Sequence, residues 1–130
     1  MVLNLSEKTI LIVDDDNVSA FLFKELIEPT GAKIISVDDG HSALQVIKKQ
    51  RIDLVLLDLR LEDCSGFTLL KDIRKINAKA IIIAQTAYAM IEDYRECIEA
   101  GFDDYLPKPI VSEDLYAKLM KYLAPENSVK

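Results

Sequence analysis

Cysteine and histidine are scarce in this sequence of 130 residues, which contains two cysteines and one histidine. Cys64 and Cys97 show neither a CxxC motif nor a Cys/His spacing, so we expect no zinc site and two reduced thiols rather than a disulfide. The single histidine, His41, excludes any mechanism that needs two. Its place directly after Gly40, at an expected helix start, predicts a surface residue.

Long apolar runs and an excess of positive charge are also missing. No apolar stretch approaches the roughly 20 residues that a membrane span requires, and the first seven residues contain no basic segment. Sixteen Lys and Arg against twenty-two Asp and Glu make the chain acidic, so a nucleic-acid backbone would be repelled. We therefore expect a cytoplasmic protein that binds neither membrane nor nucleic acid directly.

The chain does contain enough apolar material for one core. Half of its residues are hydrophobic, and its length predicts a single domain over residues 1–130, with a core from about 8 to 123 and a polar tail at 124–130. Short apolar runs lie at 9–13, 33–37, 54–57, 80–84 and, more weakly, 105–106. Apolar residues at helical spacing lie between them and after the last, at 18–27, 43–47, 69–76, 91–98 and 115–123.

This order predicts an α/β fold in which a β-α unit is repeated five times. The alternation implies a five-stranded parallel sheet with helices on both faces. The helix boundaries carry their own signals: Pro29-Thr30-Gly31 ends the first helix, Ser65-Gly66 opens the third, Gly101 follows the fourth, and Ser112-Glu113-Asp114 caps the fifth. Functional groups are expected at the carboxyl ends of the strands, where the loops meet.

Acidic residues gather at that edge. The run Asp14-Asp15-Asp16 follows the first expected strand, and Asp58 follows the third. Adjacent carboxylates repel one another unless a cation neutralises them, and magnesium prefers such oxygen ligands. For Asp14 and Asp15 alone, helix capping is an equal alternative, and Asp16 is expected to act only as a cap. The addition of Asp58 favours a metal site.

A hydroxyl and an ammonium follow the last two strands at matching places. They belong to Thr86 and Lys108. Each alone is weak evidence, because a threonine at a strand end is commonly a cap and a lysine is commonly solvated. Together at one edge, they supply the hydrogen bond and the positive charge that a phosphoryl group requires.

Taken together, the pattern resembles the receiver domain of two-component response regulators from about Lys8 to Leu123. The matching motifs are Ile10-Leu11-Ile12-Val13-Asp14-Asp15-Asp16, Leu56-Leu57-Asp58, Gln85-Thr86-Ala87 and Leu106-Pro107-Lys108-Pro109. The resemblance implies a flavodoxin-like (βα)5 fold with strand order 2-1-3-4-5. It also implies a protein that catalyses only its own phosphorylation and dephosphorylation, and so is not a turnover enzyme.

The resemblance assigns a role to each site residue. Asp58 is the nucleophile that accepts the phosphoryl group, and Asp14, Asp15, Asp58 and the backbone carbonyl of Arg60 are the expected ligands of Mg²⁺. Lys108 pairs with the bound phosphate, and the Lys108-Pro109 bond is expected to be cis.

The resemblance also implies a switch and a class of partner. Thr86 bonds a phosphoryl oxygen, Tyr105 moves inward with it, and the surface of the fourth helix, fifth strand and fifth helix changes. The expected partner is a histidine kinase or a histidine phosphotransfer domain, and the protein itself is expected to be a monomer or a weak dimer. The stretch Thr86-Ala87-Tyr88-Ala89-Met90 favours receivers attached to hybrid sensor kinases, although stand-alone receivers are similar.

One departure keeps a second reading open. Most family members have proline four residues beyond the phosphoacceptor, where this chain has Glu62, and the loss of proline would loosen the loop. A degenerate receiver that only binds partners is therefore an alternative. A haloacid dehalogenase-type phosphatase is disfavoured because Arg60 stands where it needs a second acid, and a flavodoxin-like cofactor binder because Asp14-Asp15-Asp16 would repel phosphate.

Overall fold

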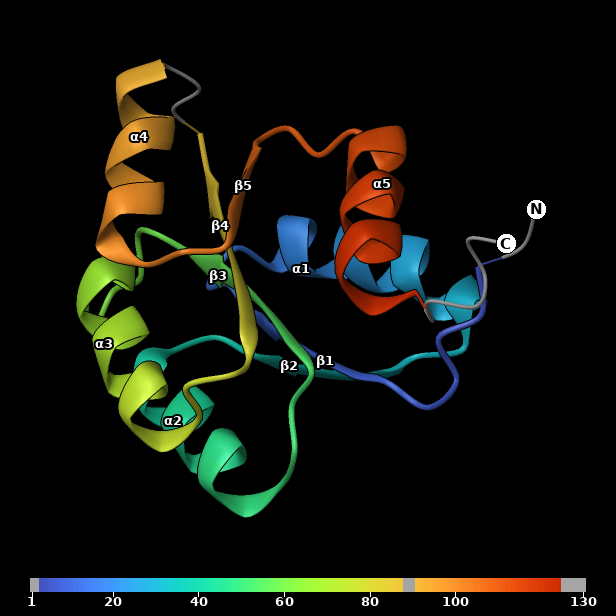
Figure 1. Ribbon diagram of the computed structural model, residues 1–130, viewed down its shortest axis with the longest axis horizontal. Coiled ribbons are helices and arrows are strands. Elements are labelled where there is room, and N and C mark those ends of the chain that lie inside the picture. Colours follow the sequence, from blue (N-terminus) through green and yellow to red (C-terminus); the bar gives the residue numbers. More distant parts are fainter. Residues whose placement is uncertain (1–2, 88–90, 125–130) are drawn as a thin grey trace.

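A parallel sheet of five strands forms the centre of the protein in a computed structural model that describes residues 3–87 and 91–124 (Figure 1). The strand order is β2-β1-β3-β4-β5, as the resemblance implied. The strands are β1 (Thr9–Val13), β2 (Lys33–Val37), β3 (Leu54–Asp58), β4 (Ile81–Thr86) and β5 (Asp104–Pro107). The helices are α1 (Asn17–Ile27), α2 (Gly40–Lys49), α3 (Gly66–Ile76), α4 (Ile91–Ala100) and α5 (Ser112–Leu123).

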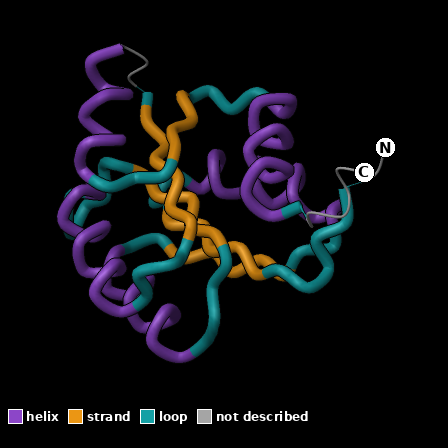
Figure 2. The backbone as a smooth tube through the Cα atoms, in the orientation of Figure 1, coloured by secondary structure: helices purple, strands orange, loops and turns teal. Residues whose placement is uncertain are grey.

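The helices cover both faces of the sheet, which Figure 2 shows edge-on between two groups of helices. Side chains of α2, α3 and α4 pack with one face of the strands in a first buried cluster, the α2/α3/α4 core. Side chains of α1 and α5 pack with the other face in a second cluster, the α1/α5 core. Because β3 is covered on both faces, all five of its residues are buried, which explains why its first four residues, Leu54–Leu57, are all apolar.

Most helix ends follow the signals in the sequence. Asp16 caps α1 by accepting a hydrogen bond from the Val18 backbone N–H, and Ser65 caps α3 in the same way. After α1, a short 3-10 turn leads to Gly31, which has a left-handed φ of 84°. The predicted cap of α5 is wrong, because Ser112 is the first helical residue and Val111 occupies the cap position without a side-chain hydrogen bond, but Glu113 and Asp114 do place negative charge in the first turn.

Several expectations about single residues can be compared with the structure. His41 is exposed, as predicted. None of the helices, within the described ranges, is long and apolar enough to cross a membrane. Tyr88, Ala89 and Met90, which contributed to the hybrid-kinase prediction, lie outside the described residues, as does most of the expected polar tail at 124–130.

Candidate functional site

The carboxyl ends of the strands bring the predicted site residues to one edge of the sheet. Asp58 is the last residue of β3 and pairs in register with Gln85 of β4. Thr86 ends β4 and pairs with Pro107, so that Lys108 follows at the same level. Asp14 continues β1 beyond Val13, and its backbone N–H donates to the carbonyl of Val37 at 3.1 Å.

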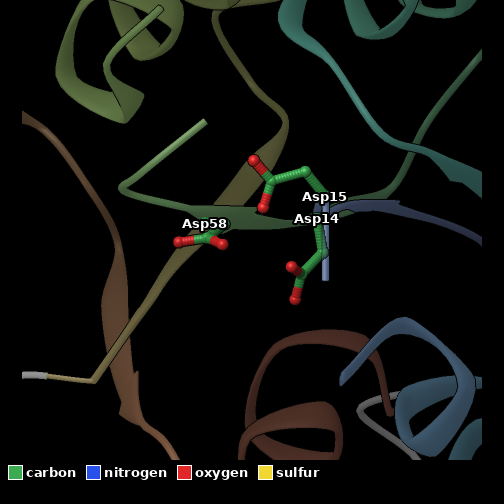
Figure 3. A group of neighbouring side chains, drawn as sticks. All are labelled: Asp14, Asp15 and Asp58. Atoms are coloured by element: carbon green, nitrogen blue, oxygen red, sulfur yellow. The ribbon is translucent and has the colours of Figure 1, made fainter. Parts of the chain in front are cut away.

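Three carboxylates lie together at this edge (Figure 3). Asp14, Asp15 and Asp58 each offer an oxygen, and these oxygens lie within 4.8 Å of one another. The side chain of Asp14 is 0% exposed and that of Asp58 is 9% exposed, whereas Asp15 is open to solvent. The arrangement concentrates negative charge where water provides little screening.

Lys108 supplies the positive charge that balances this group. Its Nζ lies 3.3 Å from Asp58 Oδ2, to which it donates a hydrogen bond, and 3.2 Å from Asp14 Oδ2. Its backbone N–H donates to the Thr86 carbonyl at 2.7 Å, and the Lys108-Pro109 bond is cis, as expected. The ammonium therefore bridges carboxylates from two different strands.

Burial and the neighbouring charges shift the pKa values of Asp14 and Lys108. Burial raises the pKa of Asp14 to about 6, and the neighbouring charge of Asp58 adds to this effect. Burial alone would lower the pKa of Lys108, but the charges of Asp14 and Asp58 outweigh it and hold that pKa above its ordinary value. The ammonium thus remains charged at neutral pH, while Asp14 ionises less readily than an ordinary aspartate.

The donor set fits a hard divalent cation. Asp14 Oδ2 is buried and accepts no aligned hydrogen bond from the described residues, although Lys108 Nζ lies at ion-pair distance. A buried anionic oxygen in this state is a favourable ligand for a cation. Carboxylate oxygens within 4.8 Å of one another are the ligands that Mg²⁺ prefers.

The remaining predicted residues belong to the loop after β3 and to strands β4 and β5. The backbone N–H of Arg60 donates to Asp58 Oδ1 at 3.0 Å, which places the start of the β3–α3 loop directly beside the carboxylate. Thr86 is 3% exposed and Tyr105 is 9% exposed. The Tyr105 ring makes an edge-to-face contact with Tyr94 of α4, with ring centroids 5.9 Å apart.

The β3–α3 loop is anchored by a residue that the sequence analysis did not single out. Asp63 Oδ1 and Oδ2 accept hydrogen bonds from the Gly40 N–H at 3.0 and 3.1 Å, and Oδ2 also accepts one from the His41 N–H at 3.2 Å. The bond from Gly40 is the main reason that the pKa of Asp63 lies below its ordinary value. The loop next to Asp58 is therefore tied to the amino terminus of α2, despite the glutamate where proline was expected.

Gln85 is a second residue that the sequence analysis passed over. It is 0% exposed, and neither its amide nitrogen nor its amide oxygen has a hydrogen-bond partner among the described residues. Its signal in the sequence was a lone amide at the end of the apolar run Ile81-Ile82-Ile83-Ala84.

Comparison with known proteins gives a consistent result. The family model described as the response regulator receiver domain matches residues 10–120. The chain is 34% identical over 120 residues to the transcriptional regulatory protein ZraR of Escherichia coli K12, with 92% of this chain and 27% of ZraR covered. It is 34% identical over 118 residues to the sensor histidine kinase GacS of Pseudomonas protegens, with 87% of this chain and 13% of GacS covered. The chain thus spans only a small part of these relatives.

A solved structure shows the same fold. The receiver domain of the sensor histidine kinase PA1611 from Pseudomonas aeruginosa PAO1 superimposes with a TM-score of 0.81 at 31% identity, over 89% of this chain and 97% of that one. That protein has a magnesium ion coordinated in its active site cleft.

Proposed function

Because the chain belongs to the response regulator receiver domain family of two-component systems, we propose that Asp58 accepts the phosphoryl group in a magnesium-dependent reaction. The observation that carries this proposal is the Lys108 ammonium, which lies between the carboxylates of Asp58 and Asp14 at 3.3 and 3.2 Å. The Lys108 side chain thus already places a positive charge beside the proposed acceptor. Asp14 and Asp58 hold its ammonium, and the Thr86 carbonyl holds its backbone.

The residues around Asp58 have separate roles: some bind the metal ion, and others orient the Asp58 carboxylate. Asp14, Asp15, Asp58 and the carbonyl of Arg60 are the proposed ligands of Mg²⁺, which would neutralise charge on the carboxylate and on the phosphoryl oxygens. The Arg60 N–H, bonded to Asp58 Oδ1, leaves Oδ2 as the oxygen that faces Lys108.

Transfer needs little beyond this orientation. An Asp58 oxygen attacks the phosphorus of a phosphohistidine, the P–N bond breaks, and the imidazole leaves with the electron pair of that bond. Lys108 and the Thr86 hydroxyl stabilise the charge on the phosphoryl oxygens. Hydrolysis later returns Asp58 to its carboxylate, so the domain modifies itself and turns over no separate substrate.

The switch is proposed to involve Thr86 and Tyr105. Thr86 would move toward the phosphoryl group, and the buried Tyr105 ring would fill the space it leaves, which changes its contact with Tyr94 on α4. A phosphorylated domain would therefore present an altered surface of α4, β5 and α5.

The proposal also covers the phosphoryl donor, the oligomeric state and the location of the protein. A histidine kinase or a histidine phosphotransfer domain is the proposed source of the phosphoryl group, and the relatives include both a sensor kinase and a transcriptional regulator. A single domain over 1–130, a monomer or weak dimer, and a cytoplasmic location complete the proposal. A degenerate receiver finds no support, because Asp14, Asp58 and Lys108 lie together as phosphoryl transfer requires.

Intact mass measurement with a small phosphodonor tests the assignment. The wild-type protein should gain one phosphoryl group only when magnesium is present, and Asp58→Asn should gain none. Asp53→Asn is the matched control, because Asp53 precedes β3 at the opposite end of the strand. A magnesium-dependent adduct on Asp58→Asn would show that another residue is the acceptor.

A further inference from the structure

Gln85 stands in the same row of the sheet as the two buried carboxylates. Asp58 and Gln85 pair directly between β3 and β4, which places their Cα atoms about 4.8 Å apart. Asp14 lies on the other side of Asp58, one residue beyond the pairing of Val13 with Leu57. The row therefore runs from carboxylate to carboxylate to amide across three neighbouring strands.

These side chains also share one face of the sheet. Residues two positions apart in a strand point to the same side. Asp14, Asp58, Gln85 and Lys108 each follow, by two positions, a member of the α1/α5 core, respectively Ile12, Leu56, Ile83 and Leu106. The amide of Gln85 is thus on the side from which the Lys108 ammonium reaches Asp58.

The amide has an unmet capacity for hydrogen bonding. Gln85 is 0% exposed, and its Oε1 and Nε2 have no partner in the part of the chain that the structure describes. Burial of an amide in this state destabilises the fold, and an apolar side chain of the same length would avoid that penalty. Packing alone therefore gives no reason for a glutamine here.

A divalent cation would change the position of Lys108. In this structure the ammonium lies 3.2 Å from Asp14 Oδ2, which is one of the proposed metal ligands. Two cations cannot share that buried oxygen without strong repulsion, because screening is weak in the interior. The backbone of Lys108 is held by Thr86, so its side chain must find another acceptor on the same face.

We propose that Gln85 is a positioning residue of this site, whose amide oxygen accepts a hydrogen bond from the Lys108 ammonium when a divalent cation displaces that ammonium from Asp14. This inference rests on the proposed function. Gln85 touches neither metal nor phosphoryl group, and acts by giving Lys108 a defined second position next to Asp58.

Magnesium titration by calorimetry on a double-mutant cycle tests this role. The proteins are the wild type, Gln85→Met, Lys108→Met and the double variant, with Gln45→Met on the exposed face of α2 as the matched control. Loss of one hydrogen bond to a charged group should weaken magnesium binding about tenfold in Gln85→Met. In the Lys108→Met background, the same substitution should change the affinity by less than about twofold.

The titration distinguishes a failure of the Gln85 role from a failure of the magnesium site itself. Equal magnesium affinity of wild type and Gln85→Met, or equal weakening with and without Lys108, would overturn the role of Gln85 while leaving the metal site intact. A wild-type protein that binds no magnesium would instead contradict the proposed function. Thermal unfolding adds an independent readout: without metal, Gln85→Met should unfold at the same or a higher temperature, and a less stable variant would mean that the amide is already satisfied.

Discussion

Replacement of Asp14 by asparagine is expected to stabilise the metal-free protein at neutral pH. Burial raises the pKa of Asp14 from its ordinary 3.8 to about 6, so the folded protein holds the ionised form at a cost. Each pKa unit corresponds to about 1.36 kcal/mol, which gives about 3 kcal/mol for this displacement. Asparagine is neutral and nearly the same shape, but its buried N–H groups need partners, so we expect a net gain of about 2 kcal/mol in the free energy of unfolding.

The sign of this effect can be followed through pH. Because the pKa of Asp14 is raised in the folded state, the stability linked to its protonation is fully present below pH 3.8 and is lost as pH rises through about 6. The wild type and Asp14→Asn should therefore differ little at about pH 4 and differ most above about pH 7. Urea unfolding at several pH values measures the difference directly.

Saturating magnesium should make the wild type, rather than Asp14→Asn, the more stable of the two proteins. A ligand that binds only the folded state stabilises it, and Asp14→Asn lacks one of the proposed carboxylate ligands. Asp16→Asn is the control, since Asp16 is exposed and asparagine also caps helices, so the stability of this variant should stay close to that of the wild type. The reasoning would be refuted if Asp14→Asn were less stable than the wild type above about pH 7 without metal, or if the difference did not depend on pH.

Three further substitutions probe contacts away from the carboxylates, each by urea unfolding. Asp63→Ala removes the acceptor of the α2 amino terminus and should cost about 1 kcal/mol and also weaken magnesium binding, whereas Asp63→Asn should retain most of the stability. Tyr122→Phe removes a 2.8 Å hydrogen bond to the buried Asp104 and should cost about 1 kcal/mol; no change would mean that Lys118 and Lys121 satisfy that carboxylate without the tyrosine. Arg74→Met removes the fork that joins α3 to the Gly101 carbonyl and to Asp103, with an expected cost of about 2 kcal/mol, and Arg74→Lys should restore only part of it.

The sequence predicted the fold well where burial controls residue type. The run Leu54–Leu57 has no polar residue because β3 is covered on both faces, so its position could be read from composition alone. The signal for β5 was weak, since only Tyr105 and Leu106 stood out, and the strand includes a buried aspartate, Asp104, that local patterning treats as loop. Its partners Lys118 and Tyr122 come from α5, which no local pattern reveals.

The candidate site was predictable as a set of residues but not as a set of contacts. Asp14, Asp58 and Lys108 could be placed at one edge, because parallel strands end together. That Lys108 bridges the two carboxylates depends on side-chain conformations that the sequence does not encode locally. Gln85 and Asp63 were missed for a related reason, since their significance arises from the strand register and from a loop that docks on a distant helix.

The docking of the β3–α3 loop on α2 turns Cys64 into an intrinsic reporter. A methyl group at Gly40 would lie 2.5 Å from Cys64 Sγ, so the thiol packs tightly against the start of α2. Burial, with the charge of Asp63, raises the pKa of this thiol, and both factors slow its reaction with alkylating reagents while the loop is docked. The other cysteine, Cys97, is 0% exposed within the α2/α3/α4 core. The alkylation rate of Cys64 in the native protein should therefore rise when the loop beside Asp58 leaves the helix, so this natural thiol can report on the loop without an engineered residue.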